Sequence, residues 1–167
     1  MNFLKVPLIL ILLSLAGCKI YSFTGASVSP DVNTLSVATF PSYQATLAPP
    51  SLSQSFTESL KDIFLRQTNL ALIKNNGDLI IEGEITSYRQ TDEAVTGNDV
   101  SSLSRLTITV KVSYTDTKNE DNSYQQSFSN FAQFDGTQNL SEVEAGLIEE
   151  INEKLAQDIF NRSLGNW

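Results

Sequence analysis

The chain has 167 residues, a net charge of −8 and no histidine. This length is enough for one domain with a real core, and the acidic balance argues against nucleic acid as a partner, because nucleic acid is bound largely through Lys and Arg. The absence of histidine removes the usual general base near neutral pH, the commonest zinc ligand and the Ser-His-Asp triad. We therefore expect a protein that is not an enzyme and that holds no metal or cofactor.

Residues 1–17 are typical of a secretory leader. Lys5 supplies the positive charge at its start, and an unbroken apolar run follows over residues 8–13. A transmembrane helix is the first alternative, but the run is too short, since a span needs about 20 apolar residues. A leader cut by the general signal peptidase is the second alternative. Against it, the small residues lead directly into Cys18, the only cysteine. We predict cleavage before Cys18 and acyl chains on Cys18 that anchor the chain in a membrane.

After the leader, the pattern predicts a tether over residues 18–30 and a single domain over residues 31–167. A short strand at 35–40 ends at Pro41, and a proline-containing loop follows. Ser51 and Gln54 form a capping-box pattern before a stripe of apolar residues at helical spacing, which predicts a helix to about Thr68. The sequence Asn-Asn-Gly-Asp at 75–78 predicts a turn.

Three strands and a second helix complete the domain. The strands are expected at 79–88, 103–115 and 124–134. The middle strand alternates apolar and polar residues, as in an antiparallel sheet with one buried face. The aromatic residues of the last strand change parity, which suggests a bulge near Asn130. Ser141 and Glu144 form a second capping-box pattern, which predicts that the last helix begins there.

The pattern fixes a fold class and part of a register. Burying Ile81 and Ile85 on the same face as the apolar residues of the middle strand places Glu82 or Glu84 opposite Lys111 on the wet face. Two amphipathic helices beside a half-buried sheet predict a β-α-β-β-β-α chain. We expect an α+β two-layer sandwich, with both helices on one face of a four-stranded mixed, mostly antiparallel sheet.

Several segments together carry a resemblance that spans almost the whole chain after the leader. They are CKIYSFTGAS from Cys18, LSQSFTESLKDIF from Leu52, GDLIIEGEITSY from Gly77, RLTITVKVSYT from Arg105, QSFSNFAQFD from Gln126 and the tail DIFNRSLGNW. This ordered set resembles LptE, a family of lipopolysaccharide-assembly lipoproteins, in the form seen in flavobacteria. The resemblance implies an outer-membrane lipoprotein that plugs the LptD β-barrel, supports its assembly and helps to deliver lipopolysaccharide to the outer leaflet.

Two arginines are candidates for contact with lipopolysaccharide. Arg89 and Arg105 flank the loop 90–104 and should converge at one end of a hairpin, where the guanidinium groups suit bidentate phosphate contacts. The simpler interpretation is a pair of rim arginines satisfied by Asp92, Glu93 or Asp99, since exposed ion pairs are common. Phe131, Phe134 and Trp167 are further candidates for contact with a partner, although aromatic residues on a strand usually belong to the core.

Two other functions remain open on the sequence alone. One is a different outer-membrane interaction lipoprotein, such as a secretion-channel pilot or a surface-displayed binding module. The other is a glycan hydrolase that uses Glu82 and Glu84, which share one strand face about 7 Å apart and so lie near the spacing of an inverting pair. A face with no aromatic platform and no sign of a cleft argues against the hydrolase.

Overall fold

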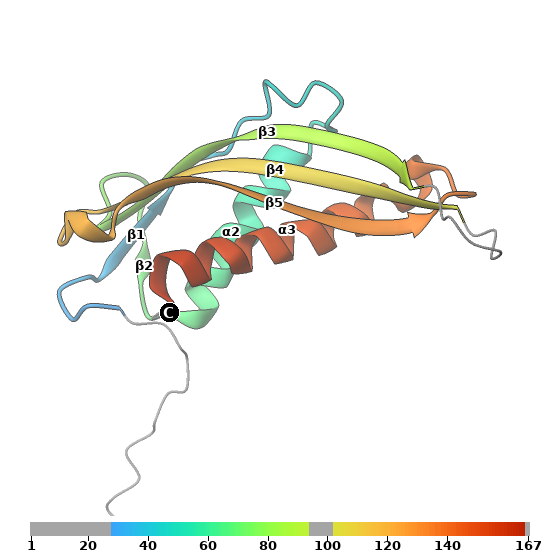
Figure 1. Ribbon diagram of the computed structural model, residues 1–167. Coiled ribbons are helices and arrows are strands. Elements are labelled where there is room, and N and C mark those ends of the chain that lie inside the picture. Colours follow the sequence, from blue (N-terminus) through green and yellow to red (C-terminus); the bar gives the residue numbers. More distant parts are fainter. Residues whose placement is uncertain (1–27, 94–101, 166–167) are drawn as a thin grey trace, which may run out of the picture.

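The computed structural model describes residues 28–93 and 102–165 (Figure 1). The predicted leader, Cys18 and Trp167 lie outside these residues, and so does most of the predicted tether. The elements in chain order are β1 (Thr34–Val37), α2 (Leu52–Gln67), β2 (Ala71–Leu72), β3 (Leu79–Glu93), β4 (Leu103–Asp116), the 3₁₀ turn η2 (Glu120–Asn122), β5 (Tyr124–Asp135) and α3 (Leu140–Leu164).

The predicted two-layer α+β sandwich is confirmed. One sheet has the strand order β2-β1-β3-β4-β5, and both helices lie beneath it on the same side (Figure 1). Strands β1 and β3 pair in parallel and are joined through α2, as expected for a strand that returns to its neighbour through a crossover helix. Strands β3, β4 and β5 form an antiparallel meander.

The sheet has five strands rather than the predicted four. The additional strand β2 contains only Ala71 and Leu72 and pairs in parallel with Thr34 and Leu35 of β1. Both of its side chains are exposed. A two-residue strand with no buried side chain has no alternation of apolar and polar residues, which explains why the sequence pattern misses it.

The register predicted between β3 and β4 is confirmed over the first half of the pair. Ile81 lies opposite Tyr114, Ile85 opposite Val110 and Glu84 opposite Lys111. The bulge predicted near Asn130 is wrong, because β5 pairs with β4 without a register shift from Tyr124 to Asp135. The irregularity lies in β3 instead, between Ile85 and Ser87. It moves Tyr88 onto the buried face, although its number has the opposite parity to Ile85.

Neither predicted capping box forms, although both helices are present. Helix α2 begins after Ser51 without a cap from its side chain, and the Gln54 amide donates to the Glu58 carboxylate. Helix α3 begins one residue earlier than predicted, at Leu140, which packs against the core. The Glu144 carboxylate accepts the hydroxyl hydrogen of Tyr88 and so does not return to the start of its own helix. Hydrogen bonds to other side chains therefore use both Gln54 and Glu144, one within its own helix and one to a distant strand.

The core lies between the sheet and the two helices. Phe40 packs edge-on against Phe56 of α2, with ring centroids 5.0 Å apart, and Phe64 packs edge-on against Phe160 of α3 at 5.1 Å. These aromatic pairs bury large apolar areas and join α2 both to the chain after β1 and to α3. In the described part of the chain, no helix is long and apolar enough to cross a membrane.

Asp78 joins the ends of three strands at the predicted turn. Its carboxylate accepts hydrogen bonds from the backbone N–H groups of Asn33 and Thr34 and lies 2.9 Å from Lys118 Nζ. The bond from the Asn33 N–H and the contact with Lys118 hold the pKa of Asp78 well below its usual range. The turn thus fixes the start of β3 against β1 and the end of β4.

Candidate functional site

The sheet face opposite the helices is polar. Threonine and serine side chains of β4 and β5 line it, and the Thr109 and Ser129 hydroxyl oxygens are 3.0 Å apart across the two strands. The face has no helix over it, because α2 and α3 both lie on the other side (Figure 1). The predicted wet face of the sheet is therefore a broad, open surface.

Arg89 and Arg105 lie on this open face, near the hairpin end of β3 and β4. Arg89 is opposite Thr107, and Arg105 is opposite Thr91, so the two arginines are diagonal neighbours on adjacent strands. Diagonal neighbours of this kind have Cα atoms about 7–8 Å apart, within reach of one ligand for two long side chains. The structure thus brings the two predicted residues together on one surface.

Phe131 of β5 completes a cluster with these arginines. The Arg105 guanidinium carbon lies 3.9 Å from the centroid of the Phe131 ring, in cation–π geometry. Phe131 is 40% exposed, so it does not belong to the core. Lys154 reaches round from α3, with its Nζ 6.0 Å from the ring centroid. We refer to Arg89, Arg105, Phe131 and Lys154 as the cationic cluster.

The simpler interpretation pairs the two arginines with Asp92, Glu93 or Asp99, and Asp92 is the one whose side chain the structure describes. Asp92 is opposite Ser104, and its carboxylate accepts the Ser104 hydroxyl hydrogen at 2.7 Å. Ser104 is buried on the helix side of the sheet, whereas Arg105 lies on the open side. Asp92 is therefore aimed away from the arginines. The side chains of Glu93 and Asp99 lie outside what the structure describes.

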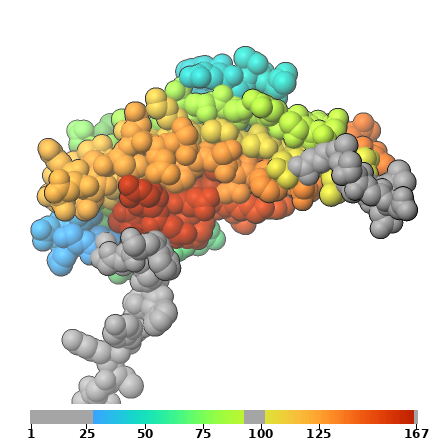
Figure 2. Space-filling model, viewed as in Figure 1, coloured from blue at the N-terminus to red at the C-terminus, as the bar shows by residue number. Residues whose placement is uncertain are grey.

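A second exposed feature is the loop between β1 and α2, for which the sequence predicts no role beyond joining the two elements. It rises above β3 on the open side of the sheet, and its atoms stand above the strands in Figure 2. Tyr43 is 87% exposed and Leu47 is 79% exposed. The Gln44 side chain donates to the Glu84 carboxylate at 3.0 Å, which holds the loop to the sheet.

The two glutamates of the hydrolase hypothesis do not share a cleft. Glu84 is directed to the loop through Gln44, while Glu82 lines a separate shallow cavity together with Lys74 and Asn75. Across the described residues, no grouping of His, Cys, Asp or Glu has the geometry to hold a metal ion. The arrangement of Glu82 and Glu84 therefore gives no support to carboxylate catalysis.

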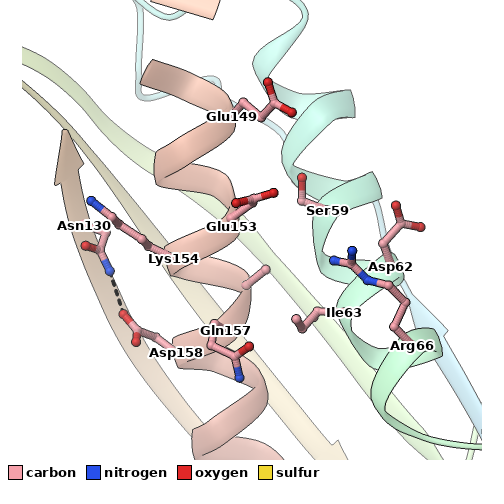
Figure 3. Close-up of a pocket in the computed structure, with 11 residues that line it drawn as sticks. Ser59, Asp62, Ile63, Arg66, Asn130, Glu149, Glu153, Lys154, Gln157 and Asp158 are labelled. Carbon is pink, nitrogen blue, oxygen red and sulfur yellow. Dashed lines mark hydrogen bonds between the residues drawn. The ribbon is translucent and has the colours of Figure 1, made fainter. Parts of the chain in front are cut away.

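A groove between the two helices has a volume of ≈ 670 Å³ (Figure 3). Glu149 and Glu153 of α3 face Asp62 and Arg66 of α2 across it, and all four charged groups border solvent (Figure 3). Solvated charges of both signs screen one another, so this groove is best explained as the wet outer surface of the helix layer.

Tyr88 is a buried polar residue with a structural contact. Its hydroxyl donates to the Glu144 carboxylate of α3. Burial raises the pKa of Tyr88 above its usual value, and the bond to Glu144 raises it further. The hydroxyl thus stays protonated and acts as a donor that joins β3 to α3.

The comparisons with known proteins agree with this fold. A family model described as "LptE: Lipopolysaccharide-assembly" matches residues 32–163. A search of curated protein sequences gives no match.

Three solved structures are similar to this chain, and the two with a TM-score above 0.5 share its fold. One is a minor lipoprotein from Acinetobacter baumannii, with 16% identity and a TM-score of 0.49 over 78% of this chain and 91% of that chain. Another is a hypothetical protein from Chlamydia trachomatis, with 13% identity and a TM-score of 0.54 over 78% and 95%. A neuraminyllactose-binding hemagglutinin homolog from Helicobacter pylori has 12% identity and a TM-score of 0.53 over 84% and 88%.

Proposed function

The chain belongs to the LptE family of lipopolysaccharide-assembly proteins, and from this we propose that it is an outer-membrane lipoprotein that plugs the LptD β-barrel. In this role the domain supports assembly of the barrel and delivery of lipopolysaccharide to the outer leaflet. Acyl chains on Cys18 anchor it, with the domain on the periplasmic side and partly enclosed in the barrel. The observation that carries the proposal is the family match, which covers nearly the whole described domain.

The surface of the domain supports this proposal. Barrel lumens are polar and wet, so a domain that sits inside one needs a polar exterior. The open sheet face meets that need with threonine and serine side chains, and the loop over it adds two exposed apolar residues, Tyr43 and Leu47. Exposed apolar side chains within a polar rim are typical of a contact with another protein. We assign this loop to the barrel contact.

Affinity purification tests the proposal. The lipidated protein is recovered from detergent-solubilised outer membrane, and the proteins that co-elute are identified by mass spectrometry. We expect a large β-barrel in stoichiometric amount. Recovery of the protein alone, or together with a different channel, would remove the plug function.

A pair of variants sharpens this test. Tyr43→Ser with Leu47→Ser should lower recovery of the barrel without loss of folded protein, because both side chains are exposed. The matched control is Leu65→Ser with Leu72→Ser, which removes two exposed leucines elsewhere on the surface. Equal recovery with both double variants would exclude the loop as the contact.

The cationic cluster is the proposed contact for lipopolysaccharide, an anionic glycolipid. Guanidinium groups donate paired hydrogen bonds to phosphate oxygens, and these bonds are roughly twice as strong as neutral ones. The Phe131 ring fixes the Arg105 guanidinium on the open face, and Arg89 adds a second guanidinium one diagonal step away. Local positive charge of this kind allows an acidic protein to bind an anionic ligand.

Arg89→Ala combined with Arg105→Ala should weaken binding of lipopolysaccharide by about tenfold or more, since each lost charge-assisted bond contributes about 1.5–3 kcal/mol. Binding is measured by calorimetry in detergent, with circular dichroism to establish that the variant is folded. The control is Lys61→Ala with Arg66→Ala, which removes the same charge from α2 and should bind like the wild type. Unchanged binding by the arginine variant, or an equal loss in the control, would contradict the assignment.

A further inference from the structure

Strand β5 forms an edge of the sheet and pairs with β4 on one side only. It is long and regular, without a register shift from Tyr124 to Asp135. No charged residue and no proline occurs from Tyr124 to Phe134. Edge strands are normally protected by charges, proline, bulges or short length, because their unpaired N–H and C=O groups accept another strand. The opposite edge follows that rule, since β2 has only two residues.

The structure shows which way the peptide groups of β5 point. The Phe131 carbonyl accepts a hydrogen bond from Lys154 Nζ at 3.1 Å, and the Phe131 N–H donates to the side-chain oxygen of Asn130 at 3.3 Å. These peptide groups therefore face away from β4. Since the direction alternates along an antiparallel strand, the groups of Gln125, Ser127 and Ser129 also point outward.

The edge is thus closed at Phe131 and open before it. In the described part of the chain, no side chain caps the outward peptide groups of Gln125, Ser127 and Ser129 in the way that Lys154 and Asn130 cap those of Phe131. The side chains of residues 125–127 are all exposed, including that of Gln126 on the helix side. Atoms of β5 form a band at the surface above the C-terminal half of α3 (Figure 2).

The three open positions are symmetric about Ser127. We propose that the free lipoprotein forms a two-fold dimer in which β5 pairs antiparallel with β5 of a second copy. Ser127 lies opposite its own counterpart, and Gln125 lies opposite Ser129. The two sheets then continue into one, with all helices on the same side, because the two-fold axis is perpendicular to the sheet.

The side chains fit a second copy of the same chain. Like charges directly opposite one another destabilise a strand pair, and this segment has none. Asp158 of α3 accepts a hydrogen bond from Asn130 at 2.7 Å, and the Arg162 guanidinium lies 4.6 Å from the Tyr124 ring centroid. With Ser127 on the axis, Asn130 lies opposite Tyr124 of the partner subunit. Asp158 of each copy therefore lies close to Arg162 of the partner subunit, and two attractive charge pairs border the strand pair.

Disulfide crosslinking tests the register. Ser127→Cys is introduced into the full chain, which is purified in detergent and mildly oxidised. Directly opposed residues of a hydrogen-bonded antiparallel pair have Cα atoms about 5.5 Å apart, which suits a disulfide. We expect a covalent dimer on a non-reducing gel. Ser113→Cys is the matched control, since it lies on β4 opposite Gln125 and too far from the axis. The wild type controls for Cys18.

Ser127→Pro separates dimerisation from folding. The Ser127 N–H points away from β4, so proline removes no bond within the sheet but blocks the partner strand. We expect sedimentation to show a dimer for the wild type and a dissociation constant raised by about tenfold or more for the variant, equivalent to the loss of about 1.4 kcal/mol. A monomeric wild type, a dimer that persists in Ser127→Pro, or equal crosslinking at Ser113 would overturn the proposal.

The same cysteine variant identifies a different occupant of the edge. Crosslinking of the detergent-purified protein to a heavier protein that co-purifies with it, with no covalent dimer, would overturn the proposal in favour of a strand from another chain. These measurements concern the free lipoprotein and include neither recovery of the barrel nor lipopolysaccharide binding, so their failure leaves the proposed plug function in place.

Discussion

Gly83→Ala is expected to lower the free energy of unfolding by about 3 kcal/mol or more, the upper end of the cost of overfilling a packed core. A Cβ atom at position 83 would lie 2.1 Å from the carbonyl oxygen of Lys111 and 2.5 Å from the Phe40 ring. The ring could move, but the carbonyl belongs to the backbone of β4. The strand pair itself must therefore shift, in a domain whose total stability is about 5–15 kcal/mol. Urea denaturation followed by circular dichroism measures the change.

Two further variants identify the cause of this loss. Gly146 lies in α3 with open space around the position of a Cβ, so Gly146→Ala should raise stability by about 0.5–1 kcal/mol. Adding Phe40→Ala to Gly83→Ala should not restore stability, because the clash with the Lys111 carbonyl remains. Stability of Gly83→Ala within about 0.5 kcal/mol of the wild type, the range of neutral surface substitutions, would contradict this account.

The elements with a regular pattern could be predicted from the sequence. Strand β4 alternates without exception, because its buried residues face the helices along its whole length. The stripe of α2 predicts its end within one residue, since the apolar spacing stops where the core stops. The pairing of Glu84 with Lys111 follows from the same alternation once Ile81 and Ile85 are assigned to the buried face.

The bulge is predicted in β5 but lies in β3, which shows the limit of predictions made from the alternation of side chains. In β3 the buried residues change from odd numbers, at Ile81 and Ile85, to an even number at Tyr88. The sequence contains this parity change. A strand predicted to end at Tyr88, however, has Tyr88 as its last residue, so the change does not suggest a bulge. In β5 the change of parity at Phe131 predicts a bulge, but the strand pairs with β4 without a register shift. Phe131 is simply a residue on the open face, and its partner Arg105 belongs to another strand.

The candidate site was predictable only in part, because some of its contacts join residues that are far apart in the sequence. Arg89 and Arg105 flank one hairpin, so their proximity follows from local sequence. Lys154 comes from α3 and reaches Phe131 across the edge of the sheet, a contact that no spacing along the chain predicts. The exposed Tyr43 and Leu47 lie in a loop whose path depends on backbone bonds to β3, such as that from the Ile85 N–H to the Pro41 carbonyl.

Phe134→Ala is expected to lower the free energy of unfolding by about 3–5 kcal/mol, the usual cost of removing a buried phenylalanine. Phe134 is 7% exposed and belongs to the same core as Phe128 and Ala132, which share its parity on β5. Phe131→Ala is the matched change three residues away, on the open face. It removes the contact with the Arg105 guanidinium and should cost about 1 kcal/mol or less.

Chemical denaturation of both variants under the same conditions tests the difference. A large loss for Phe134→Ala and a small one for Phe131→Ala would support an unbulged β5, because only a continuous register keeps Phe134 on the same buried face as Phe128. A bulge near Asn130 would move Phe131 onto the buried face and Phe134 onto the open face, and Phe131→Ala would then be the variant that loses several kcal/mol by the cavity mechanism. A larger loss for Phe131→Ala than for Phe134→Ala would therefore contradict the register of β5 and, with it, the outward direction of the peptide groups at Ser127.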